Sequence, residues 1–209
     1  MSNHLAVATV TEALREFIAR NLTDLPLAVN VSAQRPPTEP PAEPTITVFC
    51  YSVNPDPQAR NVDAPTRASD GTLLMVPRAA LDLSYLISFY GDEAQLIPQR
   101  MLGCVVRALY VQPTLSRDDI LAAQAQPFLA GSNLDADPQQ VRFTPTHQDI
   151  DELYRLWTMM TGTQMALSLT YQATLVFIDG KQTPVTGPEV QTRTITVVPS
   201  VPARIGGVP

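Results

Sequence analysis

The 209-residue sequence has little of what nucleic-acid-binding proteins and metal sites require. Charged residues make up 16% of the chain, the net charge is −6, and Lys181 is the one lysine. Because phosphate binding needs clustered Lys and Arg, this composition excludes a typical nucleic-acid-binding protein. The histidines, His4 and His147, show no metal-ligand spacing with each other or with Cys50 and Cys104. We therefore expect no nucleic-acid partner, no metal site and no Cys–His nucleophile.

The sequence also lacks a disulfide framework, a long hydrophobic run and a secretory signal. Two widely spaced cysteines are too few for a disulfide-stabilised fold, so Cys50 and Cys104 are expected to be buried, reduced thiols. No apolar stretch approaches the roughly 20 residues of a membrane-spanning helix, and we expect no direct membrane insertion. The N-terminus has neither the basic region nor the apolar core of a signal peptide, so assembly in the cytoplasm is expected. The 44% share of hydrophobic residues excludes a wholly disordered chain.

Sequence motifs of enzymes are missing as well. There is no Gly-x-Gly-x-x-Gly, no glycine-rich phosphate loop before a lysine, and no Gly-x-Ser-x-Gly. The acidic group Asp149, Asp151 and Glu152 is explained by the preference of carboxylates for a helix N-terminus. We therefore expect no catalytic residue and no cofactor, and the composition favours a part of an assembly. A monomeric adaptor and an uncharacterised hydrolase stay open as alternatives.

Proline, in contrast, is abundant, with 20 residues, of which nine lie in two segments. Residues 35–44 hold five prolines, which rule out a helix or a central strand and predict an extended connector. A proline-rich ligand for a partner is the alternative interpretation of this segment. Residues 54–79 are too long for an ordinary connection, and loops of this length are usually functional or disordered.

Helices are predicted at four places. Apolar positions at helical spacing predict one over residues 4–22, and Pro98, suited to a first helical turn, starts another. Ser116 caps a third helix. Asp149 and Glu152 resemble a capping box for a fourth, which Gly162 ends. Its apolar stripe is expected to pack in the core and comprises Ile150, Leu153, Tyr154, Trp157 and Met160.

Strands are predicted over residues 27–31, 45–53, 80–90, 141–144, 165–178 and 190–198. Residues 80–90 alternate between apolar and mainly polar positions, which indicates an antiparallel strand with one buried face. Residues 165–178 would span roughly 46 Å when extended, so this strand is expected to bend or to project from the domain. Asp179-Gly180 is a hairpin-turn signal, after which residues 190–198 return as an edge strand or an arm.

These elements predict an α+β fold, in which a mainly antiparallel sheet is flanked by about four helices, with long loops and a C-terminal β-arm. The expected organisation is one domain over residues 1–180, followed by a strand or arm and a flexible tail over residues 181–209. The loop around residues 60–78 is rich in Arg and Asp, and Arg is favoured over Lys at protein interfaces. A solvated loop with biased codon usage explains the same residues equally well. The candidate interface residues of this loop are Arg60, Asp63, Arg67, Asp70 and Arg78.

Residues 79–92 read AALDLSYLISFYGD and are followed by PQRMLG at 98–103. This pattern resembles the N-terminal domain of cap, or tail-terminator, proteins in contractile phage-tail-like injection systems of the virulence-cassette and antifeeding-prophage type. Residues 1–14, the loop over 60–71, and LYRLW at 153–157 leading into LSLTYQ at 167–172 look similar too. The resemblance spans about residues 1–180. Some relatives carry a further C-terminal domain, which leaves the function of that domain in doubt for this chain.

The resemblance implies a structural protein and not an enzyme. It implies a homo-oligomeric ring, expected to be a hexamer, at the distal end of the inner tube, in contact with the tube protein and the terminal sheath layer. Such a ring would stop polymerisation and stabilise a particle that is released from the cell. Ring contacts close on themselves, and added strands give such contacts a defined geometry. Gln191, Arg193 and Ile195 are therefore further candidate interface residues, on a strand that could join a neighbour.

Overall fold

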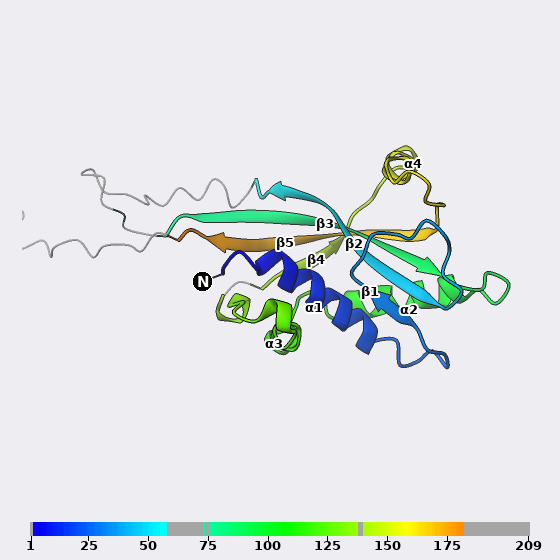
Figure 1. The fold of residues 1–209 in the computed structure, drawn as a ribbon, viewed down its shortest axis with the longest axis horizontal. Helices are drawn as coiled ribbons and strands as arrows, with labels where there is room; N and C mark the ends of the chain where they lie inside the picture. Colours follow the sequence, from blue (N-terminus) through cyan, green and yellow to red (C-terminus); the bar gives the residue numbers. More distant parts are fainter. Residues whose placement is uncertain (1, 58–72, 74–75, 138–139, 182–209) are drawn as a thin grey trace, which may run out of the picture.

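The computed structural model describes residues 2–57, 73, 76–137 and 140–181. Five strands form one sheet in the order β1-β2-β3-β5-β4, and helices cover both of its faces (Figure 1). The strands are β1 (Asn30–Ser32), β2 (Thr45–Pro55), β3 (Arg78–Tyr90), β4 (Arg142–Pro145) and β5 (Leu167–Asp179). The α-helices are α1 (Ala6–Arg20), α2 (Ile97–Val111), α3 (Arg117–Gln124) and α4 (Ile150–Met159), and two short 3₁₀ helices lie at Pro127–Leu129 and Leu134–Ala136. The predicted α+β class is confirmed.

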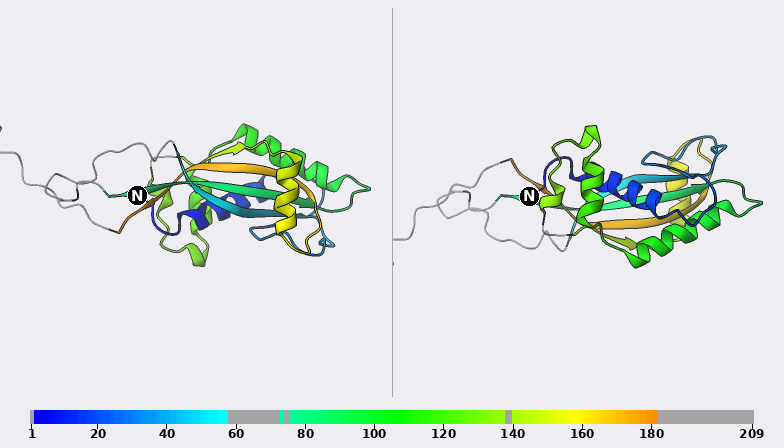
Figure 2. Two further views of the ribbon diagram at one scale, coloured as in Figure 1. Left: turned by 90° about the horizontal axis from the view of Figure 1, so that it is seen from above. Right: turned by 90° about the horizontal axis from the view of Figure 1, so that it is seen from below.

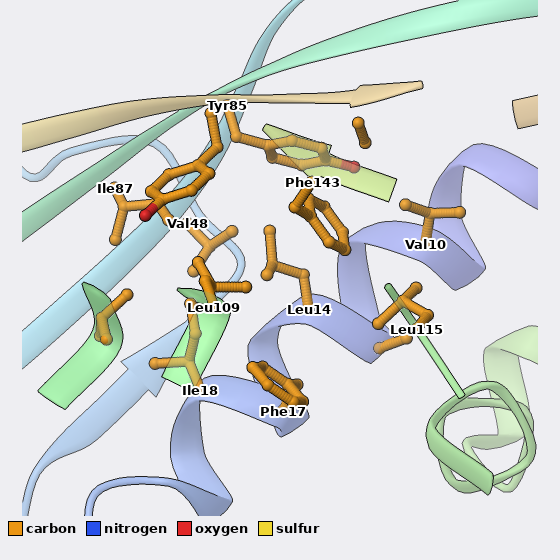
Figure 3. Close-up of a cluster of buried hydrophobic side chains, with 14 of the residues drawn as sticks. Val10, Leu14, Phe17, Ile18, Val48, Tyr85, Ile87, Leu109, Leu115 and Phe143 are labelled. Carbon is orange, nitrogen blue, oxygen red and sulfur yellow. The ribbon is translucent and has the colours of Figure 1, made fainter. Parts of the chain in front are cut away.

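The two faces of the sheet are covered unequally. Helices α1, α2 and α3 lie on one face, and α4 lies alone across one end of the other (Figures 1 and 2). The larger core forms on the three-helix face, where α1 packs its apolar side against β2, β3 and β5 (Figure 3). Its fully or almost fully buried side chains include Val10, Leu14, Phe17, Ile18, Val48, Tyr85, Ile87, Leu109, Leu115 and Phe143. The period-two pattern of residues 80–90 thus identifies the face of β3 that lies in the larger core. The prediction of a single buried face is wrong, because Asp82, Leu86, Ser88 and Tyr90 on the other face are buried too.

Tyr85 shows how a polar atom is accommodated in this core. Its hydroxyl group lies 2.8 Å from Thr11 Oγ1 on α1, and its ring meets Phe143 edge-on at a centroid distance of 6.2 Å. Burial raises the pKa of the Tyr85 phenol, so the group stays protonated across the physiological range. The hydrogen bond satisfies a hydroxyl that would otherwise cost stability in an apolar environment. It also fixes the position of α1 along β3.

Local signals in the sequence set the helix starts. Pro98 occupies the first turn of α2. Ser116 and Asp119 form a reciprocal capping box at α3, with Asp119 N donating to Ser116 Oγ and Ser116 N donating to Asp119 Oδ2. At α4, Asp149 is the N-cap and accepts a hydrogen bond from Ile150 N at 2.7 Å, but Glu152 does not complete the predicted capping box. These predicted starts are confirmed because caps depend on neighbouring residues and not on the rest of the fold.

The proline segment makes the one parallel pairing of the described sheet possible. Strand β1 runs parallel to β2, with Asn30 opposite Thr45 and Ser32 opposite Thr47. Parallel neighbours need a connection that returns the chain to its starting end, usually of a dozen residues or more. Residues 33–44, which contain the five prolines, provide this return without forming a helix. The predicted role of a stiff connector fits this position.

Strands β3 and β5 pair along almost their whole lengths and project past the helices as a long ribbon (Figure 1). The pairing continues to Gly180 N, which donates to Pro77 O at 2.8 Å. An irregularity interrupts it, where Leu175 has a φ of 64° and one extra residue of β5 faces β3 near Asp82. Beyond this bulge, the positions of β5 that face the core shift by one residue, so that Val176 is buried. The expectation that this strand bends or projects is confirmed.

Cys50 and Cys104 are both free and only half-buried, so the expectation of fully buried thiols is wrong in its degree. Cys50 packs against the larger core from β2, and Cys104 does so from α2. Burial raises the pKa of the Cys50 thiol, which keeps it protonated and unreactive at neutral pH.

Candidate assembly interface

Arg78 is the one predicted interface residue that the structure describes. It lies at the outer end of the β3–β5 ribbon, where its guanidinium Nε donates to Asp179 Oδ1 at 2.7 Å and Nη2 pairs with Asp137. The guanidinium carbon lies 4.5 Å from the centre of the Phe177 ring. Arg78 therefore ties β3 to β5 and to the segment after the second 3₁₀ helix. These contacts stabilise the ribbon within one chain, and contact of Arg78 with a neighbouring copy stays a prediction.

The N-terminus is fastened to the same place. Ser2 N donates to Asp179 Oδ2 at 2.6 Å, and Asp179 N donates to Ser2 O at 2.7 Å. Asp179 thus accepts from Ser2 through one carboxylate oxygen and from Arg78 through the other. Charge-assisted hydrogen bonds of this kind are about twice as strong as neutral ones. The outer end of the ribbon is therefore held by side chains from three separate parts of the chain.

The other candidate residues of the sequence analysis lie outside the described residues. They are Arg60, Asp63, Arg67, Asp70, Gln191, Arg193 and Ile195. Their roles at an interface remain predictions.

Helix α4 presents an apolar surface that the sequence analysis assigned to the core. Tyr154 is 65% exposed and Ile150 is 73% exposed, so their predicted burial is wrong. Trp157 and Met160 are buried as predicted, together with Leu86 of β3, and Leu153 and Leu156 pack beside them. The apolar stripe on α4 extends further around the helix than the side that packs on the sheet. The sheet covers only the side that carries Leu153, Leu156, Trp157 and Met160. Including Leu156 in the stripe would have shifted its predicted centre away from Tyr154.

A second exposed apolar surface lies at the C-terminal end of α2. Tyr110 is 87% exposed, and Val111 and Val106 beside it are also exposed. Large exposed aromatic side chains are enriched where proteins meet other proteins. Spacing alone did not distinguish Tyr110 from the buried positions Val105 and Leu109 of the same helix. Surfaces on α2 and α4 therefore supply contact area on opposite faces of the sheet.

Strand β2 provides a third surface, which is an unpaired sheet edge. Strand β1 pairs only with residues Thr45 to Thr47 of β2. From Val48 to Pro55, β2 pairs with β3 on one side, and within the described chain no strand pairs with its other side. An edge of this length leaves backbone N–H and C=O groups available to another strand. The sequence gives no local signal for this edge because it results from the shortness of β1.

Two buried carboxyl groups, those of Asp82 and Asp119, make hydrogen bonds within the domain. Burial alone would raise the pKa of Asp119, but hydrogen bonds from Ser116 and from Arg20 outweigh burial and lower it. Asp82 lies on β3 near the bulge and accepts from Gln172 Nε2 at 2.9 Å. Burial, and then the charge of Asp56, raise the pKa of Asp82. Its partners stabilise the ionised form of Asp119, whereas the surroundings of Asp82 destabilise its ionised form. Neither side chain lines a substrate-sized cavity.

A pocket of about 140 Å³ lies at the end of the sheet, lined by residues that include Pro40, Tyr90, Pro98 and Met165. Sites for small molecules usually have volumes of roughly 300 to 1,000 Å³. Within the described ranges, no group of three His, Cys, Asp or Glu side chains gathers to hold a metal ion. None of the helices in the described part is long and apolar enough to cross a membrane.

Comparisons with solved structures identify the same fold in two cryo-EM structures. One is the sheath/tube terminator of the extracellular contractile injection system PVC in its extended state, with 14% identity over 92% of this chain and a TM-score of 0.58. The other is the tube-terminating cap of the anti-feeding prophage, AFP, with 20% identity over 90% of this chain and a TM-score of 0.61. The matches cover 65% and 60% of those two chains, so this chain spans less than two thirds of their lengths. A comparison with curated protein sequences gives no match.

The family of Pvc16 N-terminal domains is matched by residues 9–192, which include every described α-helix and strand except the first residues of α1. The resemblance that residues 79–92 and 98–103 indicate is therefore confirmed. This chain belongs to the Pvc16 N-terminal domain family.

Proposed function

We propose that this chain is a structural cap, or tail terminator, of a contractile injection system. The observation that carries the proposal is the shared fold over 90% or more of the chain with two proteins described as a sheath/tube terminator and a tube-terminating cap. Membership of the Pvc16 N-terminal domain family supports it independently. In this role the protein binds the end of a finished tube and sheath, prevents further subunits from adding, and stabilises the particle.

The proposed state is a ring of identical copies, with six as the expected number. Ring contacts are heterologous, so each copy needs two different surfaces, one for each neighbour. Further surfaces are then needed for the tube and the sheath. The described domain offers several candidates on separate sides, namely the α4 surface with Ile150 and Tyr154, the α2 end with Tyr110, and the edge of β2.

The proposed partners are the inner-tube protein and the sheath protein of the same particle. Assembly takes place in the cytoplasm, and the cap leaves the cell with the particle. The protein acts by contact and not by catalysis, without a cofactor. The small volume of the pocket at the sheet end and the structural roles of Asp82 and Asp119 support this conclusion.

The test is to prepare particles from cells that lack this protein and to measure tube and sheath lengths by electron microscopy. We expect irregular lengths without the protein and uniform lengths when it is restored. Negative-stain images of the purified full chain are expected to show rings. Normal particles in its absence would overturn the termination role, whatever state the purified protein adopts.

A further inference from the structure

The open edge of β2 has a defined chemical character on each face. Cys50 and Val53 pair with Tyr85 and Leu83, whose side chains lie in the larger core, so this row belongs to the three-helix face. Ser52 and Asn54 pair with Ser84 and Asp82 and form a polar row on the other face. Val53 is 48% exposed, although it pairs with a fully buried leucine. A strand added outside β2 would cover Val53 if it carried apolar side chains on the three-helix face.

The sequence after β5 contains a segment with this alternation. Residues 191–198 read QTRTITVV. In an extended conformation one face carries Gln191 and Arg193 followed by the apolar pair Ile195 and Val197. The other face carries three threonines followed by Val198. The apolar pair matches the Cys50 and Val53 row, and the threonine row matches Ser52 and Asn54. Threonine and β-branched residues also favour the extended backbone that pairing requires.

The path of the chain brings this segment to the correct end of the sheet. Strands β2 and β5 both run antiparallel to β3, so they end on the same side of the sheet. Nine residues, 182–190, separate Lys181 from the segment and can span up to about 30 Å. The segment can thus approach a β2 edge from the Pro55 end and lie antiparallel to it.

The ribbon carries the end of β5 past the end of β2. Pairing of β2 with β3 ends at Pro55 opposite Leu81, whereas β3 and β5 continue to Arg78 opposite Asp179. Three further residues carry the end of β5 about 10 Å beyond the last β2 pair. Arg78, Asp137 and Ser2 hold that end in place, so the described chain ends beyond the last paired residue of its own β2 strand.

We propose that residues 191–198 of one copy add as an antiparallel strand to the free edge of β2 in the next copy, with Ile195 and Val197 on the three-helix face. This contact is heterologous, because the donor and acceptor surfaces differ, and it can therefore propagate around a closed ring. The inference rests on the proposed function only for the closure into a ring. The pairing itself follows from the edge, the alternation and the chain path.

Disulfide trapping in the full-length chain tests the pairing. In a Cys50→Ser, Cys104→Ser background, Val53→Cys is combined in turn with Ile195→Cys and with Val197→Cys. On mild oxidation at least one of these pairs is expected to give covalent dimers and larger multiples on a non-reducing denaturing gel. The matched control combines Val53→Cys with Thr194→Cys, which lies on the opposite face and is expected to yield at least tenfold less product.

A mixing experiment distinguishes a segment donated by a neighbouring copy from the segment of the same chain. Copies carrying only Val53→Cys, mixed with copies carrying only the productive partner cysteine, are expected to form dimers and nothing larger. Cross-linking confined to single chains would overturn the proposal, since it would place the segment on its own β2. Preferential cross-linking through Thr194 would overturn the assigned face, and absence of any cross-link would overturn the pairing.

A truncated chain ending at Glu189 gives a second measurement. Its domain is expected to remain folded, with an unchanged thermal transition, while the oligomer seen by light scattering is lost. An intact oligomer would overturn the strand-addition proposal and leave the cap function standing. Conversely, normal tube lengths in cells lacking the protein would overturn the cap function without affecting a positive cross-linking result.

Discussion

The two faces of the sheet differ in what their side chains do. On the three-helix face, α1, α2 and α3 build one continuous core with Tyr85, Ile87 and the apolar side of β2. On the other face, the buried apolar cluster is small and comprises Leu86, Trp157 and Met160, and α4 leaves Ile150 and Tyr154 exposed. The comparison indicates that the three-helix face supplies most of the folding free energy, whereas the α4 face has a smaller apolar cluster and leaves large apolar side chains of its helix exposed.

The largest expected difference between the faces concerns apolar truncation. Leu14→Ala, at a fully buried position of α1, is expected to lower the free energy of unfolding by about 2 to 5 kcal/mol. Leu156→Ala, on the half-buried side of α4, is expected to cost less than about 2 kcal/mol because the helix can settle onto the sheet. Urea unfolding of both variants measures the difference. Equal losses would contradict the division between the faces.

A smaller effect is expected at the cap of α3. Asp119→Asn removes the carboxylate that binds Ser116 and Arg20, and should cost about 1 to 2 kcal/mol at neutral pH. Because its pKa is lowered in the folded state, Asp119 contributes stability above its unfolded pKa of about 3.9 and loses that contribution as pH falls through the folded value. The gap between wild type and variant should therefore close in acid. A gap that persists in acid would indicate a purely steric effect.

At Asp82, on the α4 side of the sheet, ionisation of the carboxyl group is expected to lower folding stability and not to raise it. Its pKa is raised, so ionisation costs folding stability, and that cost appears as pH rises from the unfolded pKa through the folded value. Asp82→Asn retains an oxygen acceptor for Gln172 and should stabilise the protein at pH 7 by less than about 1 kcal/mol. Below about pH 4 the two proteins should unfold alike. Thermal unfolding across this pH range distinguishes Asp82 from Asp119, and destabilisation at pH 7 would show that the charge is required.

The smallest effect on stability is expected on the exposed side of α4. Ile150→Ser combined with Tyr154→Ser should change the free energy of unfolding by no more than about 1 kcal/mol, since both side chains are mostly in water. If this surface meets the tube or sheath, the same variant should fail to restore uniform particle lengths. Restoration of normal lengths would restrict the contact surfaces to other parts of the molecule.

Local patterns predicted much of the fold. The alternation over residues 80–90 identifies β3, Pro98 locates the start of α2, and Ser116 caps α3, because each signal depends on adjacent residues. The spacing of Leu156 shifts the centre of the α4 stripe away from Tyr154, but the extent to which Tyr154 is exposed and the phase change at Leu175 were not predictable from adjacent residues. Both depend on which surface lies opposite, and therefore on contacts between segments far apart in the sequence. The free edge of β2 likewise becomes visible only when β1 is known to stop at Ser32.

The contact between Ser2 and Asp179 has a consequence for how the protein is made. It joins residues 177 positions apart, and the central pairing of β3 with β5 also spans a large part of the chain. Proteins dominated by such distant pairings fold slowly, in milliseconds to seconds, because loop closure precedes the gain in contacts. On the ribosome, this domain can close only after residue 179 has emerged. A copy therefore becomes competent to join its neighbours only after residue 179 has been synthesised.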